Sequence, residues 1–357
     1  MRRITYGPPG TGKTERLLKT IEIFLRFGVE PEKIGYFTFS KNAAINGKER
    51  AASKVNKPIN RFPFFQTLHS FCFTQMGLDK ARVMQPKNYQ ELGNDLDIEI
   101  EGGYNQDQDH DGTLRYDNPY LQLIHKARAL MLEPLEYYDR YEPDDTEIKR
   151  NKLDIIFEGL NIDEKGMVDF DDMLERYVNG YFDKETNRKI EFIPPEFKVV
   201  FLDEAQDCSG MQWKLFNKIE ERSEYSVVTG DDDQGIYKWN GADVDTFINL
   251  EGRRRVLKES HRVPKEPFKV ADRIIKKVIN RVDKEYYPKK ENGSVKYCQS
   301  LYEIDFTDGE WLVLASANYM LNDIGDVLDE KELYWQRRKA TPRVKNIYEI
   351  IQNWNKL

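Results

Sequence analysis

The sequence is poor in cysteine and holds no long apolar run. Its three cysteines, Cys72, Cys208 and Cys298, lie far apart and have neither disulfide nor metal-ligand spacing, so we expect reduced thiols of an intracellular protein. No apolar stretch approaches the length that spans a membrane. The first residues lead straight into a predicted strand, without the pattern of a signal peptide. These absences favour a cytoplasmic protein with no membrane segment.

Internal repeats and long low-complexity tracts are also missing. What remains is an ordinary globular composition, in which 39% of the residues are hydrophobic and 33% are charged. Such a chain is soluble and still has enough apolar side chains to build cores. The length of 357 residues predicts about two to three domains.

The net charge of −7 argues at first against nucleic acid as a partner, but the charge is distributed unevenly. Residues 1–60 hold 12 Lys and Arg against 5 Asp and Glu, and residues 252–290 hold 14 against 5. Residues 91–112 hold eight acids and neither Lys nor Arg. Because a local basic surface governs the binding of phosphates, the two basic stretches keep nucleic acid among the expected partners.

The stretch from 7 to 14 has the form G-x-x-x-x-G-K-T, which is the phosphate-binding P-loop. Residues 3–6 ahead of it form a predicted short strand. Apolar residues at helical spacing between 15 and 27 predict a helix behind it. Strand, glycine loop and helix is the context in which this motif binds nucleotide, so a chance glycine turn is a poor alternative.

The chemistry of this loop follows from its backbone. Glycines let successive N–H groups turn inward around phosphate oxygens, and the helix N-terminus adds its partial positive charge. Lys13 can reach the β- and γ-phosphates of a nucleoside triphosphate, and the Thr14 hydroxyl can bind Mg²⁺. The residues expected to hold the nucleotide are Gly7, Pro8, Pro9, Gly10, Thr11, Gly12, Lys13, Thr14 and Arg16.

Short apolar runs predict further strands at residues 33–39, 198–202, 225–229, 255–257 and 311–315. Helical spacing predicts helices from residue 41, over 266–280 and near 319–329. Apolar strands that alternate with helices predict an α/β fold with a parallel sheet covered on both faces. Residues 119–160 are mostly helical in pattern, which predicts an inserted helical subdomain.

The acidic stretch contains a partial match to a calcium-binding motif. Residues 107–112 have the pattern D-x-D-x-D-G, which matches the first half of a calcium-binding EF-hand loop. The twelfth position of that loop is Asn118 instead of the bidentate Glu, and residues 91–106 do not resemble an entering helix. The pattern therefore favours a solvated acidic surface loop over a calcium site.

A second nucleotide element follows the apolar strand that ends at Leu202. Asp203 and Glu204 come directly after it, which is the Walker B arrangement. Asp203 would hold Mg²⁺, directly or through water, and Glu204 would orient or deprotonate the attacking water beyond the γ-phosphate. An Asp-Glu pair after a strand is weak evidence for a Walker B motif when it occurs alone. It becomes strong evidence when a P-loop precedes it by the length expected within one domain.

A third polar segment follows the predicted strand at 225–229. At the end of a strand, Gln234 would contact the γ-phosphate and report its loss. Tyr237 and Trp239 lie two positions apart and share a face if the chain is extended there, so both rings would be presented for base stacking. A place in the core explains Trp239, taken alone, about equally well.

Together these segments resemble the superfamily 1 helicases of the UvrD/Rep/PcrA type. The matching runs occur in the order of that family and at sensible intervals over residues 1 to about 340, so in combination they are highly specific. They are GPPGTGKT at 7–14, YFTFSKNAA at 36–44, TLHSF at 67–71, VDFDDML at 168–174, FLDEAQD at 201–207, GDDDQGIYKWNGA at 230–242 and LKESHRVP at 257–264.

The resemblance implies the α/β fold of a P-loop NTPase. Its parts would be a RecA-like parallel sheet with an inserted helical subdomain and the first part of a second RecA-like lobe. The implied boundaries are 1–75 and 166–255 for the first lobe, 76–165 for the helical subdomain, 256–340 for the second lobe and 341–357 for a second insertion or tail.

The resemblance also implies 3′-to-5′ translocation on single-stranded DNA or at a junction of single and double strand, driven by ATP with Mg²⁺. Lys13, Thr14, Asp203, Glu204 and Gln234 would serve the phosphates, the metal and the water. Arg262 matches the arginine finger of the family, and His261 stands where the family has a Tyr that stacks on adenine. The positions that line the DNA path are matched by Phe37, Thr38, Phe39, His69, Tyr237 and Trp239, and one of the two phenylalanines should face the core.

Two departures limit the resemblance. The family has an adenine-recognising glutamine segment before the P-loop, whereas only six residues precede Gly7 here. The later motifs, with a second arginine finger, have no counterpart before Leu357. We therefore expect a UvrD-type helicase or translocase that binds ATP but unwinds no duplex by itself. The alternatives are a non-motor module that binds single-stranded nucleic acid and a nucleotide-switched subunit completed by a partner protein.

Overall fold

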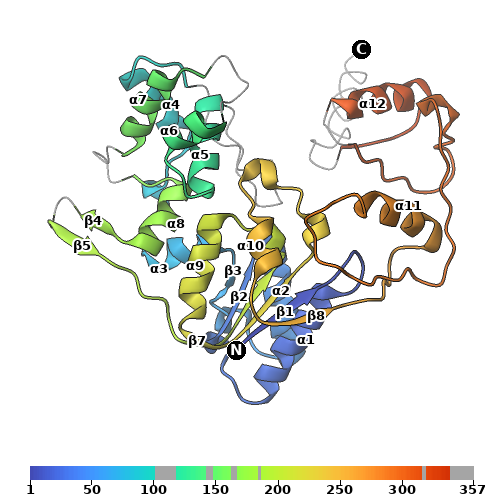
Figure 1. The fold of residues 1–357 in the computed structure, drawn as a ribbon, viewed down its shortest axis with the longest axis horizontal. Coiled ribbons are helices and arrows are strands. Elements are labelled where there is room, and N and C mark those ends of the chain that lie inside the picture. Colours follow the sequence, from blue (N-terminus) through green and yellow to red (C-terminus); the bar gives the residue numbers. More distant parts are fainter. Residues whose placement is uncertain (101–117, 142–147, 162–166, 184–185, 316–318, 338–357) are drawn as a thin grey trace, which may run out of the picture. The chain divides into compact units, whose positions relative to one another are not determined.

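The computed structural model describes residues 1–100, 118–141, 148–161, 167–183, 186–315 and 319–337 (Figure 1). The chain divides into two compact units, Met1–Gly293 and Ser294–Leu357. Within the described residues, no helix has both the length and the apolar character that crossing a bilayer requires. The calcium-like run at 107–112 and the expected tail at 341–357 lie outside the described residues.

The first unit is built on a six-stranded sheet in the order β3-β2-β6-β7-β1-β8, and all neighbouring strands are parallel. The strands are β1 (Arg2–Tyr6), β2 (Ile34–Thr38), β3 (Phe65–Gln66), β6 (Phe197–Asp203), β7 (Ser223–Gly230) and β8 (Arg253–Val256). Because carboxyl ends of parallel strands meet at one edge, the loops after β1, β2, β6 and β7 converge there. The predicted α/β fold with a parallel sheet is confirmed.

Helices cover both faces of this sheet. They are α1 (Lys13–Arg26), α2 (Lys41–Val55), α3 (Leu68–Gln75), α8 (Phe170–Asn179), α9 (Gly210–Glu220) and α10 (Val244–Asn249). Neighbouring strand residues point to opposite faces. Tyr36 accordingly packs in a core with Leu17 and Ile21 of α1, while Phe37 packs in a second core with Phe216 of α9.

Four further helices enclose a core of their own. They are α4 (Pro86–Asp95), α5 (Pro119–Ala129), α6 (Pro134–Tyr141) and α7 (Arg150–Asn161). Ile124, Leu153 and Ile156 are buried at the centre of this core. The chain returns toward the sheet where the Met84 N–H donates to the Val168 carbonyl over 2.9 Å. The predicted subdomain at 76–165 contains these helices, and its status as a separate domain remains a prediction.

The remaining elements are short. In the first unit an antiparallel hairpin joins β4 (Tyr181–Asp183) to β5 (Arg188–Ile190), and α11 (Lys265–Ile275) follows β8. In the second unit, α12 (Met320–Glu330) is held to the preceding loop, since the Lys331 ammonium donates to the Ile304 carbonyl over 2.8 Å.

The prediction of a strand at 311–315 is wrong. Leu312 and Leu314 are each 81% exposed, and the described part of the second unit offers no strand with which this segment could pair. An apolar run without a partner strand has no ladder of hydrogen bonds to hold it.

One predicted helix end differs from the structure. Helix α11 ends at Ile275 instead of 280, and the Asn280 amide donates to Asp245 Oδ1 over 2.5 Å. The implied start of a second lobe at residue 256 remains a prediction.

Candidate nucleotide and nucleic-acid site

The P-loop connects β1 to α1 at the carboxyl edge of the sheet. Gly10 and Gly12 adopt φ values of 75° and 77°, which other residues disfavour, so the turn requires glycine at both positions. A Cβ on Gly7 would lie 2.2 Å from Lys13 Cγ. The Lys13 ammonium crosses the loop and donates to the Gly7 carbonyl over 2.8 Å. The loop therefore has the backbone that phosphate binding requires.

The other predicted nucleotide residues of this region belong to the same loop and the start of α1. The Thr11 hydroxyl donates to the Pro8 carbonyl over 2.7 Å, which braces the loop from within. The Arg16 N–H donates to the Gly12 carbonyl over 2.9 Å as α1 begins, and its side chain is exposed. An exposed guanidinium one turn from the loop is free to approach an anionic ligand.

Asp203 ends β6 opposite the P-loop threonine. The Thr14 hydroxyl donates to Asp203 Oδ2 over 3.0 Å, and the Tyr36 hydroxyl lies 3.3 Å from the same oxygen. The Thr229 hydroxyl donates to Asp203 Oδ1 over 2.6 Å. Burial, and then the neighbouring Asp203 carboxylate, raise the pKa of Tyr36, so the phenol keeps its proton and donates it. Three donors from three elements thus fix the carboxylate predicted to bind the metal.

The oxygen donors at this point fit Mg²⁺. A hydroxyl from Thr14 and a carboxylate from Asp203 are hard ligands, which this ion prefers. They come from α1 and β6 and lie within hydrogen-bond distance of each other, so one small cation can contact both. Mg²⁺ usually keeps several waters and takes few protein ligands, in agreement with a site that supplies two.

Glu204 continues from Asp203 into η4 (Ala205–Asp207) with a φ of 52°, an uncommon value for a residue with a side chain. The Gln206 amide donates to Glu204 Oε2 over 3.1 Å. Burial raises the pKa of Glu204, the Lys13 ammonium offsets part of this effect, and the Asp203 carboxylate raises the pKa again. A carboxylate of raised pKa beside a phosphate loop suits a general base.

Gln234 is attached to a buried ionic cluster. Its amide donates to Asp231 Oδ2 over 2.5 Å. The Lys284 ammonium, with a side chain 0% exposed, lies 2.9 Å from Asp231, 2.5 Å from Asp232 and 2.9 Å from Asp233. Burial alone would lower the pKa of Lys284, but the carboxylates, Asp231 foremost, raise it overall. The lysine therefore stays charged and holds the loop that carries the predicted γ-phosphate sensor.

One glutamine connects the predicted base to this cluster. The Gln206 amide group donates to Glu204 and accepts from the Asp231 N–H over 2.9 Å. On the far side of the cluster, the Arg281 guanidinium grips Asp233 with two bonds of 2.8 and 2.6 Å. A continuous hydrogen-bonded chain therefore runs from the predicted base to the segment after α11.

The segment after β8 lies against the P-loop. The His261 N–H donates to the Gly10 carbonyl over 2.9 Å, and the Ser260 hydroxyl donates to the Pro9 carbonyl over 2.9 Å. A Cβ on Gly10 would lie 2.5 Å from the Cβ of Arg262. The predicted arginine finger and the predicted adenine-stacking histidine thus both stand beside the nucleotide loop, with exposed side chains.

Three aromatic rings form a strip at the same edge of the sheet, which we call the aromatic strip: Phe39, Tyr237 and Trp239. The Phe39 and Tyr237 centroids lie 5.3 Å apart with planes at 32°, and those of Tyr237 and Trp239 lie 6.4 Å apart at 50°. Trp239 is 49% exposed, which argues against a place in the core. Phe39 and Tyr237 are half-buried, so Trp239 is the ring of the strip most open to a base.

Phe37 and Thr38 do not reach this strip. Phe37 is 0% exposed, with its ring centroid 5.4 Å from that of Phe71 and 6.4 Å from that of Phe197. Thr38 is 2% exposed. The prediction that Phe37 lines a DNA path is incompatible with this packing, because the ring has no free face. Of the two phenylalanines, Phe39 remains a candidate.

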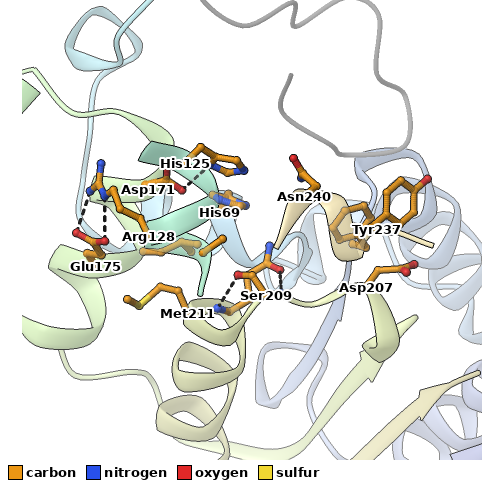
Figure 2. A pocket seen from close by; sticks show the side chains of 14 residues that line it. His69, His125, Arg128, Asp171, Glu175, Asp207, Ser209, Met211, Tyr237 and Asn240 are labelled. Carbon is orange, nitrogen blue, oxygen red and sulfur yellow. Dashed lines mark hydrogen bonds and ion pairs between the residues drawn. The ribbon is translucent and has the colours of Figure 1, made fainter. Parts of the chain in front are cut away.

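His69 opens on a small polar pocket that Phe39 and Tyr237 also line (Figure 2). Burial lowers the pKa of His69 to about 4, so its imidazole is neutral near pH 7. His125 Nδ1 lies 2.8 Å from Asp171 Oδ2. Burial would lower the pKa of His125, but the Asp171 carboxylate raises it overall. One wall of the pocket therefore holds a neutral histidine and a more basic one.

Arg128 lies on the same side of the pocket as His125 and Asp171, where α5 meets α8 (Figure 2). Its guanidinium lies 3.0 Å from Asp169, 2.7 Å from Asp172 and 2.9 Å from Glu175, and its side chain is 5% exposed. The Asp169 carboxylate also accepts from the Asp172 N–H and caps α8. The arginine therefore holds the helical part of the unit against the sheet part at the pocket.

Sequence reasoning missed Lys284, Arg281 and the pair of His125 and Asp171. The acidic run at 231–233 indicates that cations must lie nearby, and the basic stretch at 252–290 contains candidates. The spacing of the sequence does not show which of these basic residues contact the aspartates. Asp171 lies within a run that matches a known family, and nothing local indicates a distant histidine as its partner.

A P-loop after β1, oxygen donors after β6 and a polar sensor after β7 on one parallel sheet define a P-loop nucleotide-binding domain of the RecA-like kind. The model of the family described as "UvrD/REP helicase N-terminal domain" matches residues 3–254. The chain belongs to this family.

The chain is also similar in sequence to curated DNA helicases. The ATP-dependent DNA helicase PcrA of Bacillus subtilis is 26% identical over 329 residues, which cover 88% of this chain and 42% of the relative. The PcrA of Leuconostoc citreum is 23% identical over 91% of this chain and 42% of the relative, and a probable DNA helicase II homolog of Mycoplasma capricolum is 24% identical over 88% and 45%. The chain thus spans about two fifths of the length of these relatives.

Proposed function

We propose that this chain hydrolyses ATP with Mg²⁺ and uses the energy to translocate 3′-to-5′ along single-stranded DNA, as part of a helicase that acts at junctions of single and double strand. A protein partner belongs to the proposal as a further component of the machine. The relatives named ATP-dependent DNA helicase support the activity.

One observation carries the proposal: a single bonded path joins the hydrolytic carboxylate to the aromatic strip. Glu204 is bonded to Gln206, Gln206 to Asp231, and Asp231 to Gln234. Gln234 ends η5 (Asp232–Gln234), and Tyr237 directly precedes η6 (Lys238–Asn240). Loss of the γ-phosphate at Gln234 would therefore shift the position of the rings that stack on bases. A motor requires such coupling between hydrolysis and its grip on the strand.

The chemistry assigns each side chain one task. The P-loop N–H groups and the Lys13 ammonium bind and orient the phosphates, and Glu204 accepts the proton of the attacking water. Arg262 supplies positive charge where it develops on the transferred phosphoryl group. Mg²⁺, held by Thr14 and Asp203, would supply charge neutralisation at the β- and γ-phosphates.

A phosphate-release assay with and without oligo(dT) tests the proposal. We expect slow hydrolysis that single strands stimulate, and loss of nucleotide binding in Lys13→Ala with an unchanged circular dichroism spectrum. Displacement of streptavidin from the 5′ end of an oligonucleotide, and not from the 3′ end, would give the direction.

Other outcomes identify the alternatives. Hydrolysis that ignores DNA until a second protein is added would indicate a nucleotide-switched subunit. Binding of single strands without any hydrolysis would indicate a non-motor binding module, and either result would overturn the proposal for the chain alone.

A further inference from the structure

A group of arginines lies on one face of the sheet, at its β8 edge. In the parallel register of β1 and β8, Arg3 stands opposite Arg253 and Thr5 stands opposite Arg255. Alternate residues of a strand share a face. Arg3, Arg253 and Arg255 therefore project from the same side of two neighbouring strands.

These three arginines line one pocket together with Arg16 of α1, and we call it the arginine pocket. The hydroxyl-bearing residues Thr20 and Thr229 also line it. Burial, followed by the charge of Arg255, lowers the pKa of Arg16, which agrees with two guanidinium groups close together. Cations from a central strand, an edge strand and a helix thus gather around one hollow.

No carboxylate compensates this charge. The residues that line the arginine pocket include Lys13 and Arg254 as further cations and no acidic residue. Within the part of the chain that the structure describes, Arg3, Arg16, Arg253 and Arg255 form no ion pair. In a chain with a net charge of −7, such a concentration of unpaired cations attracts an anionic ligand.

Among the described residues, this end of the face is less covered than the rest of the sheet. On this side α1 and α2 bury Tyr36, Phe201 and Val199 in a shared core. Arg253 and Arg255 instead remain exposed. Parallel sheets are normally covered on both faces, and an arginine-lined surface is suited to an anionic cover instead of an apolar one.

Protection of an edge strand is the simpler explanation for charge on β8, since charged side chains there prevent pairing with another chain. That role needs cations on the edge strand alone. Arg3 lies on β1, which has neighbours on both sides, and Arg16 lies on a helix. Protection of the edge strand therefore does not explain why Arg3 and Arg16 lie beside the arginines of β8.

We propose that the arginine pocket is a second nucleic-acid contact, separate from the aromatic strip, which binds the phosphate backbone of single-stranded DNA. Guanidinium groups bind phosphate with two parallel bonds, and threonine hydroxyls are common phosphate donors. The choice of nucleic acid over an acidic peptide rests on the proposed function. The contact is additional to the nucleotide site because Arg3, Arg253 and Arg255, unlike Lys13 and Arg16, are not among the residues predicted to hold the nucleotide.

The test is the salt dependence of binding to fluorescent dT10 and dT30, measured by anisotropy on the full chain and on the double variant Arg253→Gln/Arg255→Gln. Each lost phosphate contact lowers the slope of log K against log salt by about 0.7 for single strands, so we expect a slope smaller by about 1.4 with dT30. Affinity for dT30 should fall about tenfold at low salt. Binding of dT10 should change little, because a short strand can bind elsewhere on the chain without occupying the pocket.

Two matched variants separate the pocket from general charge. Arg253→Lys/Arg255→Lys keeps the charge and should keep the slope. Arg188→Gln/Lys189→Gln also removes two positive charges, but from β5 of the β4–β5 hairpin. This variant should leave the salt slope for dT30 unchanged. Circular dichroism checks the fold of each variant. If the Gln double variant fails to fold, the Lys double variant, which keeps every charge, replaces it, because its dT30 slope should still exceed its dT10 slope.

Several results would overturn the inference. They are an unchanged dT30 slope, an equal loss in the hairpin variant, or equal slopes for the two oligonucleotides. Loss of affinity for a fluorescent ATP analogue without any change in the dT30 slope would assign the pocket to the nucleotide instead. A wild-type chain that binds no oligonucleotide would overturn both this inference and the proposed function, whereas an unchanged slope with intact DNA-stimulated hydrolysis overturns this inference alone.

Discussion

At the scale of single residues, the candidate chemistry depends on environment as much as on residue type. Asp203 and Glu204 are adjacent carboxylates with different surroundings. Asp203 accepts hydrogen bonds from Thr14, Tyr36 and Thr229, which hold its two oxygens in place to bind a cation. Burial raises the pKa of Glu204, which suits a group that takes up a proton.

Glu204→Gln should abolish hydrolysis and leave nucleotide affinity near that of the wild type. A general base contributes roughly 10²- to 10⁴-fold, so kcat should fall by about that factor. Because the pKa of Glu204 is raised, the base becomes protonated, and activity is lost, at a higher pH than an ordinary glutamate would show. A kcat profile against pH, with calorimetric titration of an ATP analogue, measures both effects. An unchanged kcat in the variant would remove Glu204 from the mechanism.

Trp239→Ala should weaken binding of single strands without changing its salt slope. Loss of one base–aromatic stack costs about 1–3 kcal/mol, which corresponds to a roughly 5- to 150-fold higher Kd. No phosphate contact is removed, so the slope should stay. Trp311, which is 53% exposed in the second unit, provides the matched control, and Trp311→Ala should bind normally. Unfolding of the Trp239 variant, or an unchanged affinity, would show that the ring serves packing instead.

At the scale of elements, the loop after β7 is held by the segment after α11. Asp231, Asp232 and Asp233 form the turn that leads to Gln234, and three carboxylates so close together repel one another unless a cation lies between them. Lys284 is that cation, and the Val282 N–H adds a bond of 2.7 Å to Asp232. The position of the sensor loop is therefore set by a distant stretch of chain.

Lys284→Met should destabilise the first unit strongly. Removal of one partner from a buried ionic cluster leaves uncompensated charge and costs about 3–5 kcal/mol. Urea unfolding, followed by fluorescence, measures the change in the free energy of unfolding. Lys289→Met is the control, since Lys289 pairs with Glu291 at the surface and such pairs contribute about 0–1 kcal/mol. A loss below about 1 kcal/mol in the Lys284 variant would mean that the carboxylates are neutralised in another way.

At the scale of the whole molecule, the nucleotide site draws on much of the first unit. The P-loop follows β1, the predicted metal ligand ends β6, the predicted sensor follows β7, and His261 and Arg262 follow β8. Elements far apart in the sequence thus meet at one edge of the sheet (Figure 1). A ligand bound there contacts all of them at once and should stabilise the unit as a whole.

A non-hydrolysable ATP analogue with Mg²⁺ should raise the melting temperature of the first unit. At a ligand concentration of about 100 times Kd the gain in the free energy of unfolding is about 2.7 kcal/mol. Calorimetry or fluorescence during heating gives the shift, and Lys13→Ala should show none. An equal shift in Lys13→Ala would place the binding site away from the P-loop.

The sequence by itself determined the α/β class, the P-loop, the Walker B pair and the sensor segment. These are local patterns, because the turn of the P-loop, the helix behind it and the acids after a strand depend on neighbours a few residues away. The alternation of apolar strands with helices was enough to predict a parallel sheet. The run at 311–315 misled because an apolar stretch becomes a strand only if a partner strand lies beside it.

Only the tertiary structure decided which distant residues meet. It buried Phe37 and left Phe39 on the aromatic strip, since the two faces of β2 meet different neighbours. It brought Lys284 to the three aspartates and Arg3 to the β8 arginines through register and chain reversal. Such pairings depend on long-range packing, in which the gain from burial is set against the cost of leaving charges unpaired across the whole unit. The local spacing of residues in the sequence does not contain this information.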